Sequence, residues 1–183
     1  MLNYTEPVIA GNQNMLQTES KKSKTIITIF AALATSIIAI DQISKALVRI
    51  NIELGSYISV IGDFFGLTYY HNSGAAFGIF QNGTVILAII SAVFAIGCLL
   101  LFFKPNIIPQ LNNTQGNIGL TLLFCGSVGN LIDRIFLGFV TDWIKLGPIP
   151  NFNIADSCVT IGVIVLIIFA LLPELFKKDQ HHA

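Results

Sequence analysis

The sequence predicts an all-α membrane protein with four transmembrane helices and a small β segment on the outer face, between the first and second helices. Hydrophobic residues make up 54% of the 183 residues and charged residues only 11%, and the mean hydropathy is +0.74. Soluble domains usually carry about 25% charged residues, so these few charges could not cover a water-facing surface. A membrane-spanning helix needs about 20 apolar residues, and four stretches reach that length, near residues 25–46, 84–103, 117–138 and 156–175.

The chain is expected to form one domain, from residue 25 to residue 176, between two polar tails at 1–24 and 177–183. The first tail is rich in Asn, Gln and Thr and is predicted to be disordered. Lys21, Lys22 and Lys24 precede the first apolar stretch, so a signal peptide is an alternative. That stretch is longer than a usual signal core and runs into Asp41 and Lys45, which favours a helix that stays in the membrane.

Charged side chains are distributed unevenly between the two ends of the predicted helices. With the N-terminus inside, the cytoplasmic side carries Lys21, Lys22, Lys24, Lys104, Lys177 and Lys178, and the outer side carries Lys45, Arg49, Arg134 and Lys145. Because Lys and Arg are enriched on the cytoplasmic side, both termini are expected in the cytoplasm. The acids at the outer ends and in the outer loops are Asp41, Glu53, Asp63, Asp133, Asp142 and Asp156. The polar chemistry is therefore predicted at the outer face.

Residues 57–70 differ from the predicted helices in composition. They are rich in Ile, Val, Phe, Thr and Tyr and are interrupted by Gly62 and Gly66, a pattern that favours short strands bounded by turns. The segment is too short to span a bilayer. We expect a small sheet on the membrane surface; a packed loop is the alternative.

Asp41 and Lys45 lie one helical turn apart at the outer end of the first helix, so they share one face. An ionisable group inside a membrane costs about 2.5–3.5 kcal/mol at the helix centre and is usually paired or functional. We expect a structural ion pair; a direct catalytic role is the alternative.

The third helix ends in small and polar residues. Gly126 and Gly129 are three residues apart and allow another helix to approach closely. Asn130, Asp133 and Arg134 share one face because they lie at i, i+3 and i+4. That face is either a polar helix end among lipid headgroups or part of a functional site in which Arg134 binds an acid or a lipid phosphate.

Two further acids could work together. Asp142 lies beside Trp143, a residue typical of the membrane interface, although it could be a turn residue in a reentrant connection. Asp156 begins the fourth helix, and Asn153 stands at the spacing of a helix N-cap. Two carboxyl groups close together share a proton, so that one is a base and the other an acid. An aspartic peptidase needs this arrangement, and it requires no metal or cofactor.

The segment from Tyr70 to Gly78 leads into the second helix. Its small residues let a substrate backbone approach closely, and Asn72 could bind that backbone; a tightly packed helix entry is the alternative. His71 is the only histidine outside the C-terminal tail, so the chain offers no convincing Ser–His or Cys–His pair. The cysteines lack metal-site spacing and are predicted to be buried apolar residues, at positions Cys98, Cys125 and Cys158.

Five segments, in this order, resemble lipoprotein signal peptidase (signal peptidase II), a family of aspartic peptidases of bacterial membranes. They are Asp41-Gln-Ile-Ser-Lys45, Asn72-Ser-Gly74-Ala-Ala-Phe77, Gly129-Asn130-Leu-Ile-Asp133-Arg134, Val140-Thr-Asp142 and Phe152-Asn153-Ile-Ala155-Asp156. The resemblance covers nearly everything from Asp41 to the fourth helix. Trp143 stands where Phe is usual in the family, and the loop from Asp142 to Asn153 looks short.

The resemblance implies a peptidase domain over residues 25–176 in the bacterial inner membrane, with its active site near the outer face. It implies cleavage of prolipoprotein signal peptides before a diacylglyceryl-modified cysteine, with Asp142 and Asp156 as the catalytic pair. The residues that would line the site are Asn72, Gly74, Asn130, Asp133, Arg134 and Asn153. The expected partners are prolipoproteins and membrane lipids. We expect a monomer, and the formal net charge of +0 argues against nucleic acid.

Two other functions remain open. A proton or ion carrier could use the acids as a relay, but it would need polar residues through the depth of the membrane, and the inner halves of the predicted helices are almost wholly apolar. A non-catalytic lipid-binding scaffold is the other alternative, and it would tolerate replacement of Asp142 and Asp156 by Asn.

Overall fold

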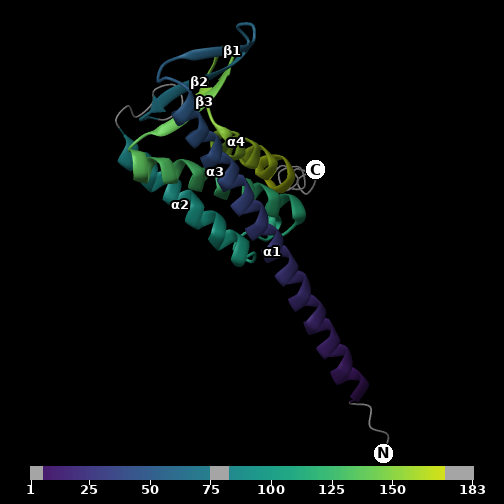
Figure 1. The fold of residues 1–183 in the computed structure, drawn as a ribbon. Helices are drawn as coiled ribbons and strands as arrows, with labels where there is room; N and C mark the ends of the chain where they lie inside the picture. The colour runs from purple at the N-terminus through teal and green to yellow at the C-terminus, as the bar shows by residue number, and fades with distance from the viewer. Residues whose placement is uncertain (1–5, 75–82, 172–183) are drawn as a thin grey trace, which may run out of the picture.

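The computed structural model describes residues 6–74 and 83–171, which form a helical bundle with an antiparallel sheet at one end (Figure 1). The helices are α1 (Glu6–Asn51), α2 (Thr84–Phe103), α3 (Thr114–Leu137) and α4 (Ile154–Leu166), with a 3₁₀ turn η2 (Pro109–Leu111) before α3 and a π-helical turn η3 (Ile167–Leu171) after α4. The strands are β1 (Tyr57–Ile61), β2 (Phe65–Asn72), β3 (Val140–Leu146) and β4 (Ile149–Phe152).

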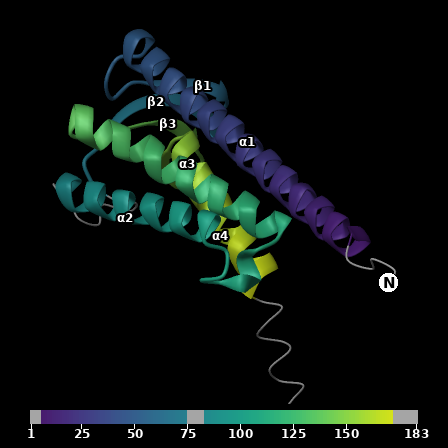
Figure 2. The ribbon, with the colours of Figure 1, turned by 90° about the horizontal axis from the view of Figure 1, so that it is seen from below.

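Helix α3 is the centre of the bundle, because it contacts α1, α2 and α4 (Figure 2). Small residues make these contacts close, as the sequence predicted. A Cβ atom at Gly126 would clash with the carbonyl oxygen of Ala155 in α4. A Cβ atom at Gly129 would lie 2.7 Å from the Asp41 carboxylate in α1. Both glycines therefore let α3 approach its neighbours at the level where the polar residues lie.

Three helices, α1, α2 and α3, are long and apolar enough to cross a membrane, and α4 with the first residues of η3 forms a shorter apolar helix over Ile154–Phe169. Their outward surfaces carry many exposed large apolar side chains, among them Val85, which is 73% exposed. The predicted helix at 84–103 is confirmed. The third helix begins at Thr114, three residues before the predicted start, and the fourth begins at Ile154, while residues 172–175 lie outside the described part.

Helix α1 differs from its predicted range at both ends. It begins at Glu6, where the sequence predicted a disordered tail over 1–24, and it continues past residue 46 to Asn51. Proline is tolerated in the first turn of a helix, and no proline follows Pro7 before the helix ends. The polar residues after Pro7 include several good helix formers, such as Gln13 and Gln17, so low hydrophobicity alone did not stop the helix.

The sheet has the order β1-β2-β3-β4, with antiparallel neighbours throughout. The strands predicted within residues 57–70 are confirmed as the β1–β2 hairpin. The second hairpin, β3–β4, was not predicted, and Asp142 lies in a strand rather than in the turn of a reentrant connection. Gly62 and Gly147, both at φ +49°, occupy the two hairpin turns. The turns are joined because the Gly147 N–H donates to the Phe64 carbonyl at 2.6 Å.

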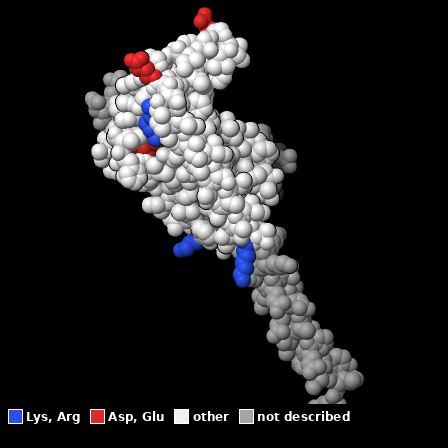
Figure 3. Space-filling model, in the orientation of Figure 1, with Lys and Arg blue, Asp and Glu red and all other residues white. Residues whose placement is uncertain are grey.

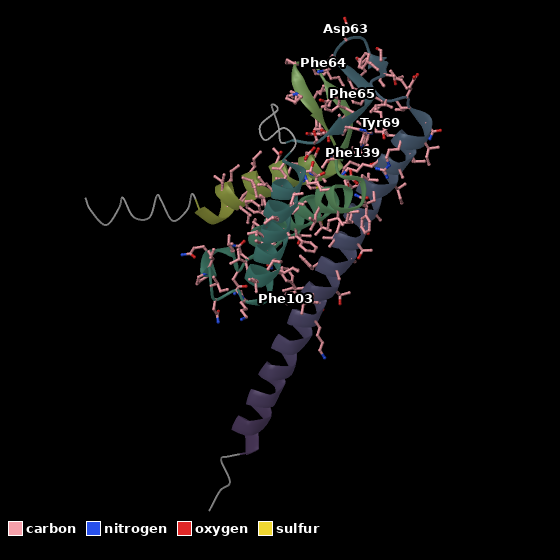
Figure 4. All side chains as sticks on the ribbon, turned by 90° about the vertical axis from the view of Figure 1, so that its left-hand side faces the viewer. Asp63, Phe64, Phe65, Tyr69, Phe103 and Phe139 are labelled. Atoms are coloured by element: carbon pink, nitrogen blue, oxygen red, sulfur yellow. The ribbon has the colours of Figure 1, made fainter. Side chains whose placement is uncertain are left out.

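Within the described residues, the helix ends that adjoin the strands lie at one end of the bundle. There α1 and α3 end, α2 and α4 begin, and both hairpins connect them. Figure 4 shows Tyr69 and Phe139 at this end and Phe103 at the opposite end. Acidic surface is found at the sheet end, whereas basic surface occurs at the opposite end and in a patch near the sheet (Figure 3). The fold therefore brings the predicted polar segments to one place.

Replacing Gly126 by Ala is expected to destabilise the bundle by about 1–3 kcal/mol, because overpacking forces α3 and α4 apart. The measurement is thermal unfolding of the purified protein in detergent. Gly97→Ala is the matched control: Gly97 is also a helical glycine, and a Cβ atom there would meet nothing within 4 Å. Equal melting temperatures for the two variants would contradict the close α3–α4 contact.

Candidate active site

A buried ion cluster lies where α1 meets α3. The Lys45 ammonium is 2.9 Å from Asp41 Oδ2 and 3.3 Å from Asp133 Oδ2. All three side chains are at most 1% exposed. The predicted ion pair of Asp41 and Lys45 is confirmed, and Asp133 extends it. Asp133, expected to line the substrate site, has its carboxylate in this cluster, where it also accepts a hydrogen bond from the Thr141 N–H at 2.9 Å.

Asn130 connects the ion cluster to Asp156. Its Oδ1 accepts hydrogen bonds from Lys45 Nζ at 3.1 Å and from Asn153 Nδ2 at 3.2 Å. Its Nδ2 donates to Asp156 Oδ1 at 2.7 Å. Since the ammonium fixes which end of the amide faces it, the N–H end must face Asp156. Lys45 therefore orients a donor toward the carboxylate without touching that carboxylate.

Asn153 holds both expected catalytic acids. Its Oδ1 accepts from the Asp156 N–H at 2.9 Å, and Asp156 Oδ2 accepts from the Asn153 N–H at 3.2 Å. This is a complete capping box at the start of α4, so the predicted N-cap is confirmed. Asn153 Nδ2 also donates to Asp142 Oδ1 at 2.8 Å. One asparagine therefore contacts both acids.

Asp142 lies on β3 and is 1% exposed. Its second oxygen, Oδ2, accepts from Asn72 Nδ2 at 2.8 Å. The Asn72 side chain is itself oriented, because its Oδ1 accepts from the Gly74 N–H at 3.0 Å. Asn72 ends β2, the strand that pairs with β3, and Gly74 follows it two residues later. Asn72 therefore binds one oxygen of the Asp142 carboxyl, and Asn153 binds the other.

The environment of Asp142 favours its protonated form. Burial, and after it the negative charge of Asp156, raise the pKa of the Asp142 carboxyl to about 7. Hydrogen bonds from Asn72 and Asn153 and the positive charge of Lys45 act in the opposite direction, because they stabilise the carboxylate. A carboxyl group that keeps its proton near neutral pH, beside a second acid, can donate a proton while its neighbour accepts one.

Arg134 binds a different partner from Asp133, although the sequence predicted that the two side chains share one helix face. Its Nη1 donates to Ser91 Oγ of α2 at 3.2 Å. The guanidinium is close enough to Asp142 and Asp156 for their charges to interact with it.

The described residues contain no group of three or more His, Cys, Asp and Glu side chains arranged to hold a metal ion. The three cysteines, Cys98, Cys125 and Cys158, are free and buried, as predicted. What the arrangement offers is a pair of carboxyl groups held by three asparagines, which suits proton transfer to and from a bound water.

Comparisons with known proteins identify the family of this chain. The family described as signal peptidase (SPase) II matches residues 33–172. The chain belongs to the signal peptidase II family. Lipoprotein signal peptidases of Dehalococcoides mccartyi and Moorella thermoacetica are 42% and 41% identical to it, over 82% and 79% of this chain and 92% and 93% of theirs. A solved bacterial membrane enzyme superposes with a TM-score of 0.72 at 32% identity, over 86% of this chain and 93% of that one.

Membership of the signal peptidase II family agrees with the resemblance of the five sequence segments, and the structure brings residues of all five together. The residues that contact this network but had no role assigned from the sequence include Arg49, Ser91 and Thr141. Arg49 could have been found from its spacing, because it extends the pair Asp41 and Lys45 by one more helical turn. Ser91 carries no such signal, since a lone serine in an apolar helix is common.

Replacing Lys45 by Met is expected to destabilise the protein by about 3–5 kcal/mol, because it leaves the Asp41 and Asp133 charges buried without the lysine's opposite charge. Thermal unfolding in detergent measures this. Lys104→Met removes an exposed lysine at the far end of α2 and should leave stability unchanged. A Lys45→Met protein as stable as this control would contradict the role of the ion cluster.

The Asp142 carboxyl is expected to lose its proton as the pH rises through about 7, rather than near its ordinary pKa of 3.8. Infrared difference spectra of protein with ¹³C-labelled aspartate, compared with those of Asp142→Asn, would isolate its carboxyl band. Loss of that band well below neutral pH would contradict the protonated state. Asn72→Ala removes a donor that stabilises the carboxylate and should therefore shift the transition to higher pH.

Proposed function

We propose that this chain is an aspartic endopeptidase of the bacterial inner membrane that removes the signal peptide from prolipoproteins, cutting before the diacylglyceryl-modified cysteine. The observation that carries the proposal is the pair Asp142 and Asp156, linked through Asn153. Membership of the signal peptidase II family supports the peptidase activity. The aspartic mechanism rests on the two carboxyl groups.

In the proposed mechanism the two acids share one proton. The charged carboxylate takes a proton from a water molecule, and the resulting hydroxide attacks the carbonyl carbon of the scissile peptide. The protonated carboxyl donates to the carbonyl oxygen, which stabilises the negative charge that develops there. The tetrahedral intermediate then collapses, the C–N bond breaks, and the leaving amine takes up a proton from the pair.

The hydrogen-bond network supports these separate roles for the two acids. Asn72 and Asn153 each donate one N–H to Asp142, and Asn130 donates to Asp156, so both carboxyl groups are held in place before substrate binds. Preorganised groups need no rearrangement in the transition state. We propose that Asn72, Gly74 and Arg134 also contact the substrate, since they approach the acids from β2 and α3 and lie outside the buried ion cluster.

We further propose four membrane-spanning helices within a peptidase domain over residues 25–176, both termini in the cytoplasm and the sheet at the outer face. Two exposed basic residues lie away from the sheet: Lys24, where the apolar part of α1 begins, and Lys104, at the C-terminal end of α2. This placement agrees with the positive-inside rule. In this orientation the two acids lie at the depth where a secreted precursor presents its lipid-modified cysteine. The partners are prolipoproteins and membrane lipids, and the enzyme acts as a monomer.

Replacing either Asp142 or Asp156 by Asn is expected to lower kcat by about a thousandfold or more, because the pair loses its shared proton. A gel-shift assay on a lipidated precursor, with purified protein, measures this. Asp63→Asn is the matched control, since Asp63 is an exposed acid in the β1–β2 turn (Figure 4).

Near-normal cleavage by Asp142→Asn or Asp156→Asn would overturn the proposed function. Proton flux into proteoliposomes that disappears in the same variants would instead favour the ion carrier. Normal binding and function without cleavage would favour the lipid-binding scaffold.

A further inference from the structure

Arg49 continues the polar stripe of α1 toward the sheet. It lies one helical turn after Lys45, and Lys45 lies one turn after Asp41. The first two residues of the stripe bind α3 through the ion cluster. The third reaches another element: Arg49 Nη1 donates to Thr141 Oγ1 of β3 at 3.0 Å. Arg49, the last residue of the stripe, therefore contacts the residue directly before Asp142.

Thr141 is fully buried, at 0% exposed, and each of its polar groups is bonded to a different part of the protein. Its N–H donates to Asp133 Oδ2 of α3 at 2.9 Å. Its carbonyl accepts from Asn153 Nδ2, at the start of α4, at 3.4 Å. Its hydroxyl oxygen accepts from Arg49 of α1. The backbone immediately before Asp142 is thus fixed from three helices.

The strand pairing beside Asp142 makes such anchoring necessary. Tyr70 of β2 pairs with Asp142, but the next pair is Leu67 with Ile144, so the register shifts between them. Two residues of β2 then face Trp143 alone. A bulge interrupts the regular ladder and bends the strand, so the ladder by itself leaves the direction of the Asp142 side chain poorly determined.

We propose that Arg49 and Thr141 are positioning residues for Asp142: the Arg49–Thr141 hydrogen bond holds the bulged strand so that the Asp142 carboxyl meets Asn72, Asn153 and Asp156. This inference rests on the proposed function, because it concerns the placement of the proposed catalytic pair. A displacement of about 1 Å in a catalytic group can lower the rate by about a hundredfold. A simpler role for Arg49 would be to stabilise the C-terminus of α1 through its charge.

The test is a double-mutant cycle on the full chain, with kcat and KM measured on the lipidated precursor. Thr141→Val keeps the shape and the backbone hydrogen bonds but removes the acceptor, and it is expected to lower kcat about tenfold with little change in KM. Thr141→Ser keeps the hydroxyl and should retain most activity. Arg49→Met should give a loss like that of Thr141→Val, and the double variant should be no worse than either single variant, because both remove one interaction.

Two comparisons separate positioning from structural roles. Arg49→Gln keeps a donor without the charge, so it should retain more activity than Arg49→Met, whereas a helix-end role predicts equal losses. Thr68→Val removes a buried threonine hydroxyl from β2, where it donates to the Ser56 carbonyl at 2.8 Å. It should lower the melting temperature about as much as Thr141→Val and leave kcat unchanged. Lys145→Met controls for loss of a cation from the sheet.

Wild-type kcat in Thr141→Val, additive losses in the cycle, or equal losses for Arg49→Met and Arg49→Gln would each overturn the inference. If Thr141→Val fails to fold, the comparison of kcat between Arg49→Gln and Arg49→Met still tests the inference. Asp142→Asn is measured beside them. If it cleaves the precursor, the proposed function itself fails; if it is inactive while Thr141→Val is normal, only the positioning role fails.

Discussion

The structure depends on a buried lysine. Lys45 lies between two aspartates with no exposed surface of its own, and such a group is stable in a membrane only when its partners are present and fixed. Those partners come from separate elements. Asp41 shares α1 with Lys45 and accepts the Ala155 N–H of α4 at 2.9 Å, while Asp133 of α3 accepts the Thr141 N–H of β3. The cluster therefore forms only when three helices and a strand are all in place, so it links the fold of the bundle to the geometry of the site.

Between the ion cluster and the two acids lies a layer of asparagine amides. Asn130 accepts a hydrogen bond from the Lys45 ammonium and donates one to Asp156. Asn153 caps α4 and donates a hydrogen bond to Asp142. An amide N–H can fix the orientation of a carboxyl group without placing a full positive charge beside it. A lysine in direct contact would hold an aspartate ionised. The amide layer permits Asp142 to keep a raised pKa near neutrality while its position stays fixed.

Much of this could be predicted from the sequence. The apolar stretches predicted the helices of the bundle. The spacing of Asp41 and Lys45 predicted the ion pair, and the spacing of Asn153 and Asp156 predicted the cap of α4. These patterns could be recognised because each lies within a short stretch of chain. The β3–β4 hairpin could not be predicted in this way. Its strand β3 is stabilised by pairing with β2, about seventy residues earlier in the chain. The helical start of α1 at Glu6 differs from the predicted disorder, because a polar composition is compatible with a helix as well as with a disordered tail.

The sequence by itself determined which residues would carry charge in an apolar chain, and the ordered motifs identified Asp142 and Asp156 among the acids. Only the tertiary structure decided what surrounds them. Asp133 lies in the ion cluster, Asn72 holds Asp142 from the neighbouring strand, and Arg49 reaches Thr141 across 92 positions of sequence. The physical reason is that a carboxylate's role depends on its distances to donors, charges and solvent. Apart from Asn153, which caps Asp156 three residues away, those neighbours come from other helices and strands, so their spacing along the chain carries no signal.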